Sequence, residues 1–401
     1  MKFLIEASQT PLPQHCEKAK LMKVMTILGT RPEIIRLSRV MAKLDELCDH
    51  RIVHTGQNYD YELNEVFFSD LAIRKPDYFL GAAGATLGQT LGAILVGAEK
   101  VLMDWRPDAV LILGDTNSAI SAIMARRLKI PVYHMEAGNR SFDRNVPEEL
   151  NRKIVDHIAD FNLVYTEHGR RHLIAEGLPQ RRIYLTGSPM REVLNHYRGE
   201  IEASNVLGRL GLEPGKYFIA SIHREENVDN SHRLRSIVEG MNRLASDFGY
   251  DVIVSVHPRT RNRIDKLSGL AVNSQVRFEK PFGYFDYNLL QMKAFCAISD
   301  SGTIAEEASI LGFPAITPRD AIERPEGVDT GCIMFTGTNA DSIVEGVNAV
   351  TKLHALNPTG SFVSPTDYQI TNTSDRVVKL ILGSARLSNA WDGIRENDLG
   401  G

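Results

Sequence analysis

The segment KVMTILGTRPEIIRLSRVMAKLDEL, residues 23–47, decides the expected fold because it joins an apolar run to an amphipathic one. Lys23–Gly29 is apolar enough for a buried strand, and Pro32–Leu47 has helical spacing. The same alternation recurs in the first half of the chain. Further strands are predicted at Arg51–Gly56, Ala109–Gly114, Val132–Glu136, Leu163–Thr166 and Ile183–Gly187, with helices at about 86–104, 118–129, 147–159 and 168–176. Apolar strands separated by helices predict a parallel sheet covered on both faces.

A second series of strands and helices begins near Tyr217. Its strands are predicted at Tyr217–Ile222, Val252–Val256, Val276–Phe278, Ala297–Ser299 and Ala315–Thr317, with helices at about 231–248, 284–295, 303–311, 341–353 and 375–382. The segment Gly208–Lys216 lacks periodicity and marks the junction. The expected architecture is α/β, with two doubly wound Rossmann-like domains facing a cleft. They span residues 22–207 and 208–382, between an N-terminal extension (1–21) and a frayed tail (383–401).

Composition narrows the function classes. The chain has 401 residues, and 46 Lys+Arg against 50 Asp+Glu give a net charge of -4, which disfavours a nucleic-acid binder. No apolar run reaches the roughly 18 residues of a membrane span. The 4 cysteines lie far apart, so neither a disulfide framework nor a zinc site is expected, and a cytoplasmic location is favoured. Residues 1–21 lack the apolar core of a secretory signal.

The first candidate binding feature is GTRPE, Gly29–Glu33, directly after the first predicted strand. Thr30 and Glu33 have the spacing of a capping box, and Arg31 beside a helix N-terminus can bind an anion. A well-capped helix with a solvated Arg31 explains the motif equally well. Neither GxGxxG nor the P-loop motif follows the strand, so no dinucleotide cofactor and no P-loop nucleotidase is predicted.

Three carboxylates follow predicted strands of the first half. Asp115 in GDTNS and Glu136 in HMEAG lie at strand tips, where α/β sheets bind their ligands. Asp115 could instead cap the next helix. In PEE, Glu149 is interpreted as a structural residue favoured by the helix dipole, whereas Glu148 is open to either a structural or a functional role.

Two histidines follow predicted strands of the second half. His223 precedes Arg224 and can bind a phosphate or protonate a leaving group. The segment HPRTR, His257–Arg261, repeats this basic character one strand later. A core histidine with satisfied hydrogen bonds is the alternative for both.

The segment SDSGTIAEE, Ser299–Glu307, supplies the remaining candidates. Ser301 and Gly302 offer backbone N–H groups to an anion between a strand and a helix. A carboxylate one turn into that helix, from Glu306 or Glu307, can accept two ribose hydroxyls. With Arg324 nearby, these residues predict nucleotide-diphosphate binding by the second domain.

These ordered motifs resemble the non-hydrolysing UDP-N-acetylglucosamine 2-epimerase family from about residue 23 to about residue 378. The resemblance rests on GTRPE, HTGQ (54–57), GDT (114–116), HMEAG (134–138), PEE (147–149), GSP (187–189), HRE (223–225), HPR (257–259), SDSG with EE (299–307) and ERPEG (323–327). It implies a fold like that of the B-type glycosyltransferases (GT-B), with UDP held mainly by the C-terminal domain. It further implies a UDP-sugar substrate, no cofactor, no metal and a homodimer.

The resemblance also implies residue roles. Asp115, Glu136 and Glu148 match acidic catalytic residues, and His223 matches a catalytic histidine near the leaving diphosphate. The matches to substrate and UDP contacts are Arg31, Tyr287 (expected to face the uracil), Ser301, Gly302, Glu307 and Arg324. Arg36 stands where relatives often have lysine, and its role is left open.

Finer features are most similar to one branch of this family. GTRPEIIRLSRV, HTGQNYDYELNEVFF, SFDRNVPEE and HREENVDN resemble enzymes that convert UDP-2-acetamido-2,6-dideoxy-L-talose to UDP-N-acetyl-L-fucosamine for surface polysaccharides. The implied reaction eliminates UDP to a 2-acetamidoglycal and adds it back. A UDP-GlcNAc/UDP-ManNAc epimerase is the alternative within the family. A GT-B glycosyltransferase and a non-catalytic nucleotide-sugar sensor are alternatives of other classes.

Overall fold

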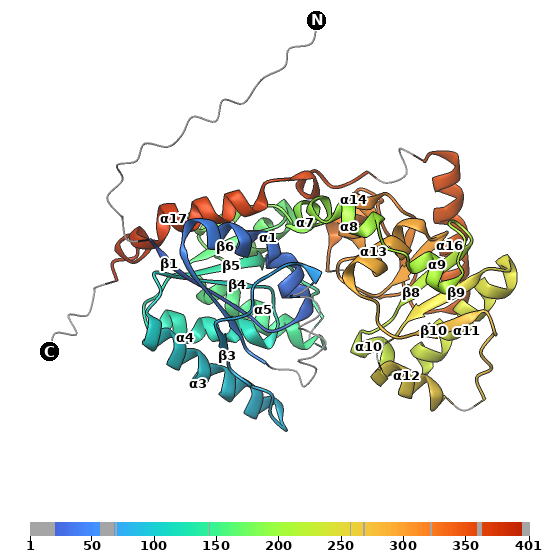
Figure 1. The fold of residues 1–401 in the computed structure, drawn as a ribbon, viewed down its shortest axis with the longest axis horizontal. Helices are drawn as coiled ribbons and strands as arrows, with labels where there is room; N and C mark the ends of the chain where they lie inside the picture. The colour runs from blue at the N-terminus through green and yellow to red at the C-terminus, as the bar shows by residue number, and fades with distance from the viewer. Residues whose placement is uncertain are drawn as a thin grey trace, which may run out of the picture.

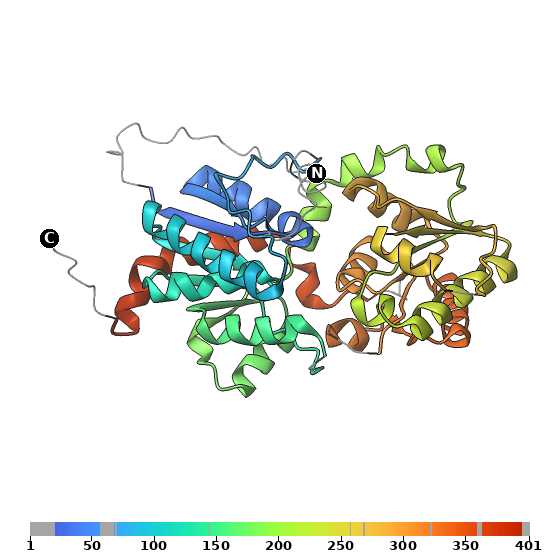
Figure 2. The ribbon, with the colours of Figure 1, turned by 90° about the horizontal axis from the view of Figure 1, so that it is seen from below.

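The computed structural model describes residues 21–56, 68, 70–143, 145–256, 258–267, 269–320, 323–358 and 363–394. Two parallel sheets, each between layers of helices, organise these residues (Figures 1 and 2). The first sheet has the order β3-β2-β1-β4-β5-β6-β7, and the second has the order β10-β9-β8-β11-β12-β13. Both orders follow the doubly wound Rossmann pattern, so the predicted fold class is confirmed.

The first sheet is buried because its strands are apolar on both faces. All five residues of β4 are buried, whereas α1 buries one face through Ile34, Leu37 and Leu44. The strands are β1 (Lys23–Leu28), β2 (Asp49–His54), β3 (Tyr78–Phe79), β4 (Ala109–Leu113), β5 (Val132–Ala137), β6 (Phe161–Val164) and β7 (Ile183–Leu185). The helices are α1 (Arg31–Leu47), α3 (Leu87–Trp105), η1 (Asn117–Ser121), α4 (Ala122–Arg127), α5 (Pro147–Ile158), α6 (Glu167–Ala175), η2 (Gln180–Arg182) and α7 (Met190–His196).

The second sheet repeats this arrangement with six strands. They are β8 (Tyr217–Ser221), β9 (Asp251–Ser255), β10 (Val276–Glu279), β11 (Cys296–Ser299), β12 (Ala315–Thr317) and β13 (Met334–Phe335). The helices are α8 (Arg198–Glu202), α9 (Val206–Leu210), α10 (Glu225–Val228), α11 (Ser231–Phe248), α12 (Pro258–Asp265), α13 (Tyr284–Lys293), α14 (Ile304–Leu311), α15 (Pro325–Asp329), α16 (Ala340–Leu356), η3 (Thr366–Gln369) and α17 (Thr373–Trp391). The edge strands β3 and β13 were not predicted, because two residues are too few to show a pattern.

The chain passes between the two halves at positions that differ from the prediction. Helix α8 precedes the predicted junction at Gly208–Lys216 and α9 overlaps its start, but both already pack against α13 of the second half. Helix α17 packs against α1 and runs over the first half (Figure 1). It continues past Leu382 to Trp391, and Ser384 Oγ lies 2.7 Å from Tyr133 Oη. The expected fraying from residue 383 is therefore wrong as far as Trp391.

The chain passes from the first half to the second after the GSP motif (187–189) and returns before α17. The two segments are in contact at the GSP motif. Gly187 has φ +83°, and a Cβ there would lie 2.6 Å from an Ile370 side-chain atom. The Thr373 hydroxyl donates to the carbonyls of Thr186 and Ser188 at 3.2 Å. Glycine is needed here because a side chain would separate the two passages.

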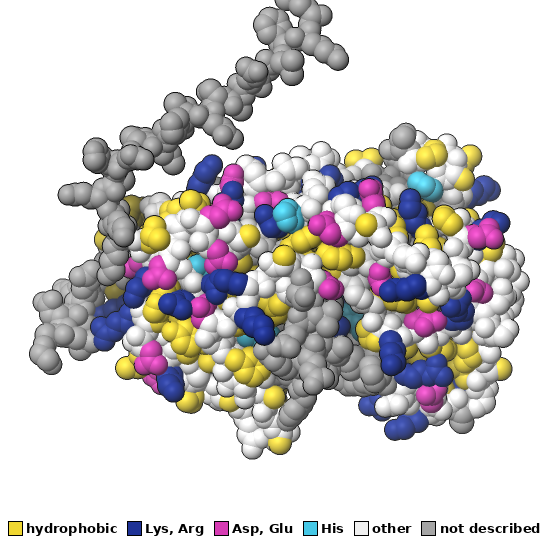
Figure 3. All heavy atoms as spheres, in the orientation of Figure 1, with side chains coloured by type: hydrophobic (Ala, Val, Ile, Leu, Met, Phe, Trp, Pro, Cys, Tyr) yellow, Lys and Arg dark blue, Asp and Glu magenta, His cyan; other side chains and the backbone are white. Residues whose placement is uncertain are grey.

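Within these described ranges, no helix combines the length and apolar character required to cross a bilayer. On the face drawn in Figure 3, acidic and basic side chains are interspersed over both halves.

Candidate active site

Each sheet has a crevice at the point where its strand order reverses, because the connections on the two sides of that point run over opposite faces of the sheet. It lies between β1 and β4 in the first sheet and between β8 and β11 in the second. Arg31 begins α1 after β1, and Asp115 follows β4. His223 and Ser301 follow β8 and β11 in the same way. Predicted site residues of both halves therefore lie at equivalent sheet edges.

The turn after β1 differs from the capping box predicted for it. Thr30 makes no side-chain cap bond to α1, and its hydroxyl instead donates to Glu33 Oε2 at 2.7 Å. The same oxygen accepts from the backbone N–H of Gly29 at 3.1 Å. Burial raises the pKa of Glu33 to about 7, although these hydrogen bonds oppose the rise. A buried carboxyl thus closes the turn that presents the partly exposed Arg31.

Asp115 is held by an arginine and is not a helix cap. Arg152 Nε and Nη2 donate to Asp115 Oδ2 at 2.9 and 2.5 Å. Thr116 caps the following helical turn, because its hydroxyl accepts from the backbone N–H of Ser118. The Asp115 side chain is 25% exposed, so its carboxylate is oriented but accessible.

Glu136 projects from an irregular strand end. A β-bulge in β5 gives Glu136 a φ of +65°, which non-glycine residues rarely adopt. Its carboxylate accepts from Arg36 Nη1, from Arg324 Nη2 at 2.6 Å and from Asn139 Nδ2 at 3.2 Å. Burial alone would raise the pKa of Glu136, but Arg36 and Arg324 outweigh it and lower the pKa. Glu136 is therefore an ionised carboxylate between two guanidinium groups.

The adjacent glutamates at the start of α5 have different environments. Glu149 Oε2 accepts from the N–H and the hydroxyl of Ser141 at 3.0 Å and from Arg152 at 3.2 Å. It thus fixes the loop before the helix, in line with the structural role expected for it. Glu148 instead faces Asp115, and burial together with the Asp115 charge raises its pKa. The structure thus groups Glu148 with the strand-tip carboxylates.

His223 is oriented by a buried aspartate. Asp300 accepts from the backbone N–H groups of His223 and Arg224 and from Asn227 Nδ2, at 3.0–3.2 Å. His223 Nδ1 lies 3.0 Å from Asp300 Oδ1, and the His223 side chain is 50% exposed. Burial would raise the pKa of Asp300, but His223 and these donors lower it. His223 is therefore not a core histidine.

The turn at Ser301 and Gly302 leads into α14. Ser301 Oγ lies 2.9 Å from Thr303 Oγ1. A Cβ on Gly302 would lie 3.2 Å from Arg224 Nη2, so the glycine lets a guanidinium approach the turn. Backbone N–H groups beside an arginine suit a phosphate group.

Glu307 lies beyond this turn, in the first turn of α14. Its Oε2 accepts from Gln291 Nε2 at 2.8 Å, and burial raises its pKa. Tyr287 on α13 lies beside Glu307 and the strand-end residues Ser221 and Ser299, and burial raises its pKa as well. The structure therefore brings Tyr287, Glu307 and the Ser301 turn to one edge of the second sheet.

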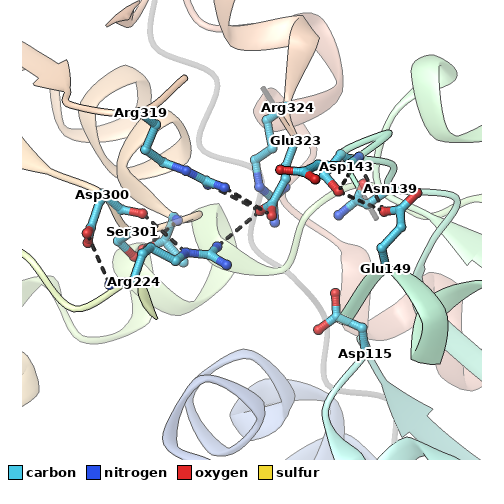
Figure 4. A network of polar contacts seen from close by, with 12 residues as sticks. Asp115, Asn139, Asp143, Glu149, Arg224, Asp300, Ser301, Arg319, Glu323 and Arg324 are labelled. Atoms are coloured by element: carbon cyan, nitrogen blue, oxygen red, sulfur yellow. Dashed lines mark hydrogen bonds and ion pairs between the residues drawn. The ribbon is translucent and has the colours of Figure 1, made fainter. Parts of the chain in front are cut away.

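A chain of ion pairs joins the two sheet edges. Glu323 lies 3.0 Å from Arg224, 3.2 Å from Arg319 and 3.9 Å from Arg152. Burial opposes ionisation of Glu323, but the arginines lower its pKa to about 2. Figure 4 shows Arg224 and Arg319 converging on Glu323, with Asp115 on the opposite side. Because Arg152 also binds Asp115, the contacts run from the first crevice to the second.

Comparison with known proteins identifies this two-domain arrangement. The family profile described as UDP-N-acetylglucosamine 2-epimerase matches residues 42–382. The chain belongs to the UDP-N-acetylglucosamine 2-epimerase family. A relative of that name from Methanocaldococcus jannaschii is 37% identical over 85% of this chain and 96% of its own. A UDP-2,3-diacetamido-2,3-dideoxy-D-glucuronate 2-epimerase from Pseudomonas aeruginosa is 37% identical over 81% of this chain and 91% of its own.

Solved structures of this epimerase family have the same fold. The structure of UDP-N-acetylglucosamine 2-epimerase from Rickettsia bellii aligns with a TM-score of 0.88 and 44% identity, covering 94% of this chain and 100% of that one. The Methanocaldococcus jannaschii enzyme in complex with UDP-GlcNAc and UDP aligns with a TM-score of 0.83 and 36% identity, covering 90% and 100%. The GT-B-like fold and the isomerase class expected from the sequence are confirmed.

Two residues that shape this epimerase site were not among the predicted ones. They are Arg152 and Glu323. Only the dense charge around the motifs hinted at them, because their partners are distant in sequence and meet through the fold. His257 of the HPRTR segment and Arg144 of the SFDRNVPEE motif lie outside the described residues.

Proposed function

We propose that this epimerase inverts C2 of a UDP-2-acetamido sugar by eliminating UDP and adding it back to a 2-acetamidoglycal. The C2 proton has no adjacent carbonyl to acidify it, so direct deprotonation is slow. As the C1–O bond breaks, its electron pair leaves with the diphosphate. The C2 proton passes to a carboxylate and the C1=C2 bond forms. The reverse steps deliver a proton to the opposite face of C2, and no redox cofactor enters this balance.

The observation that carries the proposal is the linkage of carboxylates on the first sheet to an anion-binding turn on the second. Asp115 and Glu136 are bound by arginines. The contacts of Asp115 continue through Arg152 and Glu323 to Arg224, which lies beside Gly302. A diphosphate at this turn would leave C1 and C2 facing the carboxylates. Guanidinium and N–H groups at the diphosphate would stabilise the charge that develops as it leaves.

The opposite pKa shifts of two glutamates support a division of labour. The pKa of Glu148 is raised by burial and Asp115, so Glu148 suits a proton donor. Arg36 and Arg324 lower the pKa of Glu136, so Glu136 is ionised and its carboxylate is free of the proton it would have to accept. His223 is placed near the leaving diphosphate by the resemblance. Closure of the domains would keep water from the glycal.

We further propose that the sugar is the 6-deoxy-L-talo/L-fuco pair, used in the cytoplasm for surface polysaccharide synthesis. The support is the resemblance of GTRPEIIRLSRV, SFDRNVPEE and HREENVDN to that branch. The names of the relatives favour UDP-GlcNAc as the alternative substrate.

Proton NMR in D2O tests both proposals. UDP-N-acetyl-L-fucosamine and UDP-N-acetylglucosamine are incubated with the protein in separate tubes. Deuterium at C2 and a second epimer in the first tube alone are expected. Exchange in the second tube alone would overturn the branch, and transfer to an acceptor without exchange would favour a glycosyltransferase. Absence of exchange with every UDP-acetamido sugar would overturn the reaction.

The homodimer is also part of the proposal. Helix α3 exposes Val96 (69%) and Met103 (53%), which lie seven residues apart on its outer face and which a second copy would cover. Light scattering after size-exclusion chromatography is expected to show a dimer for the wild type and a monomer for Val96→Glu. A wild-type monomer would contradict the dimer, and a dimeric Val96→Glu would contradict this interface.

A further inference from the structure

Four buried charged groups meet between the two domains, two from each. Arg36 on α1 and Glu136 on β5 belong to the first domain, whereas Glu306 on α14 and Arg324 before α15 belong to the second. Arg36 bridges the two carboxylates, binding Glu136 through Nη1 and Glu306 through Nη2 at 3.0 Å. Arg324 Nη2 does the same, at 2.6 Å from Glu136 and 3.4 Å from Glu306. We call these residues the quartet.

The quartet is almost completely buried, so its charges are expected to balance. Side-chain exposure is 6% for each arginine, 12% for Glu136 and 0% for Glu306. Two positive and two negative charges sum to zero. Removing one buried partner would leave an uncompensated charge, which is strongly unfavourable in this environment. Arg36 and Glu306 are the two members whose roles are open.

We propose that Glu306 is a positioning residue for Glu136: it compensates the positive charge that Arg324 brings to Glu136 when the domains close. The inference rests on the proposed function in taking Glu136 as a proton acceptor. Its geometric basis is that Glu306 and Arg324 share a domain and reach Glu136 and Arg36 together.

Charge counting shows why such compensation is needed. In the first domain alone, Glu136 has one guanidinium partner, Arg36. Closure adds Arg324 and, with it, the Glu306 carboxylate, so the net charge supplied to Glu136 stays at one positive unit. Without Glu306, Glu136 would face two uncompensated guanidinium groups. A carboxylate in that environment is a poor proton acceptor, because its ionised form is stabilised too strongly.

Contacts of Glu306 outside the quartet support a role in closure. The Ser188 hydroxyl donates to Glu306, and it also accepts from the Met190 backbone N–H at 3.1 Å. Ser188 belongs to the GSP motif, where the chain begins its passage between domains. Glu306 therefore binds the first domain, the passage and the second-domain arginine at once.

Other groups near Glu136 define its electrostatic environment. Arg152 adds a positive charge from α5, and the Tyr165 ring lies 5.8 and 5.9 Å from the guanidinium carbons of Arg36 and Arg324. Glu306→Gln leaves these groups in place and keeps an oxygen for Ser188. The substitution removes one charge, and it also replaces with an amide NH2 group the oxygen that Arg36 and Arg324 share.

The test compares Glu306→Gln with the matched control Glu326→Gln. Glu326 is buried in the same domain, accepts from Tyr368 Oη at 2.6 Å and lies 4.0 Å from Arg324 Nη1. No contact described for Glu326 reaches Glu136 or Arg36. The measurements are kcat and KM against pH, the Kd for UDP, and the titration of the Glu136 carboxyl by 13C NMR. Glu136→Gln identifies the NMR signal.

For Glu306→Gln we expect kcat near pH 7 to fall about tenfold and the Glu136 titration to move about one pH unit lower. The Kd for UDP should stay within about threefold, since Glu307 and the Ser301 turn, which the resemblance assigns to UDP, keep their contacts. Glu326→Gln should leave the Glu136 titration unmoved. If Glu306→Gln also leaves it unmoved, the inference is wrong. The NMR titration requires no turnover, so a moved signal in a protein without C2 exchange would overturn the proposed function and retain the role of Glu306.

Discussion

Asp115 and Asp300 occupy the same place in the two domains and differ in what their carboxylates do. Each follows the strand next to the central crevice, β4 in the first sheet and β11 in the second. Asp300 is fully buried and accepts from two backbone N–H groups and an asparagine. Asp115 is 25% exposed, and its carboxylate has one described side-chain partner, Arg152. Hydrogen-bond saturation makes one aspartate structural and leaves the other available for chemistry.

The difference extends to both sheet edges. The first presents carboxylates held by arginines, and the second presents a serine–glycine turn and an oriented histidine. Under the proposed function, one topology would supply the groups for proton transfer in one domain and for diphosphate binding in the other.

Exchanging each aspartate for asparagine gives the largest expected contrast. Asp115→Asn should abolish turnover, with kcat reduced about a thousandfold or more, and leave UDP binding intact. Asp300→Asn should destabilise the protein by about 2–3 kcal/mol, because an amide cannot accept all of these bonds. C2 exchange by NMR, UDP titration calorimetry and urea unfolding measure these effects. A near-normal rate for Asp115→Asn would remove Asp115 from the mechanism.

Helix α17 follows the second domain in sequence but packs against α1 of the first. Removing the end of α17 tests whether the helix stabilises the first domain alone. A chain ending at Leu382 loses the Ser384–Tyr133 bond and the contact of Trp391 with the Arg182 guanidinium at 5.4 Å. The first domain should lose about 3–5 kcal/mol, since buried packing and hydrogen bonds are lost together. Calorimetry should show the first domain melting earlier, and the second unchanged.

A chain ending at Ile394 is the control for this truncation, because it keeps every contact described for α17. Equal melting of the two truncated chains would show that residues 383–391 do not stabilise the first domain.

The buried carboxyls at the two crevices should respond to pH in opposite directions. Folding raises the pKa of Glu33 from 4.5 to about 7, so stability should fall as pH rises through this interval, by about 3 kcal/mol in total. The pKa of Asp300 is lowered by folding, so its contribution is lost as pH falls. Glu33→Gln should match the wild type near pH 4.5 and be more stable at pH 8. Urea unfolding across this range measures the difference, and a constant gap would contradict it.

The smallest expected effect separates the neighbouring glutamates of α5. Glu149→Gln should lower stability by about 1 kcal/mol, because it weakens the bonds to Ser141 and Arg152, with kcat within about threefold of wild type. Glu148→Gln should instead lower kcat with little loss of stability. Thermal unfolding and initial rates of both variants decide the matter. A large loss of kcat in Glu149→Gln would place Glu149 with the reacting groups.

Local pattern was sufficient for most of the fold. Buried strands such as β4 are continuous apolar runs, and helices such as α1 repeat apolar residues on one face. Local pattern did not predict elements that are too short to show a period, or contacts between residues that are far apart in sequence. The two-residue strands β3 and β13 carry no period, and the path of α17 over the first domain depends on packing against α1.

The sequence by itself determined the two parallel sheets, the strand tips that carry Asp115, Glu136, His223 and Ser301, and membership of the epimerase family, because these depend on short-range order along the chain. Only the tertiary structure decided which carboxylates have all their hydrogen bonds satisfied within the protein and which remain accessible to a ligand. It also decided that Glu306 joins Arg36 and Glu136 across the domains. Burial and ion pairing set the pKa of a carboxyl, and both depend on residues far apart in sequence, as Arg36 and Glu306 are with a separation of 270 positions.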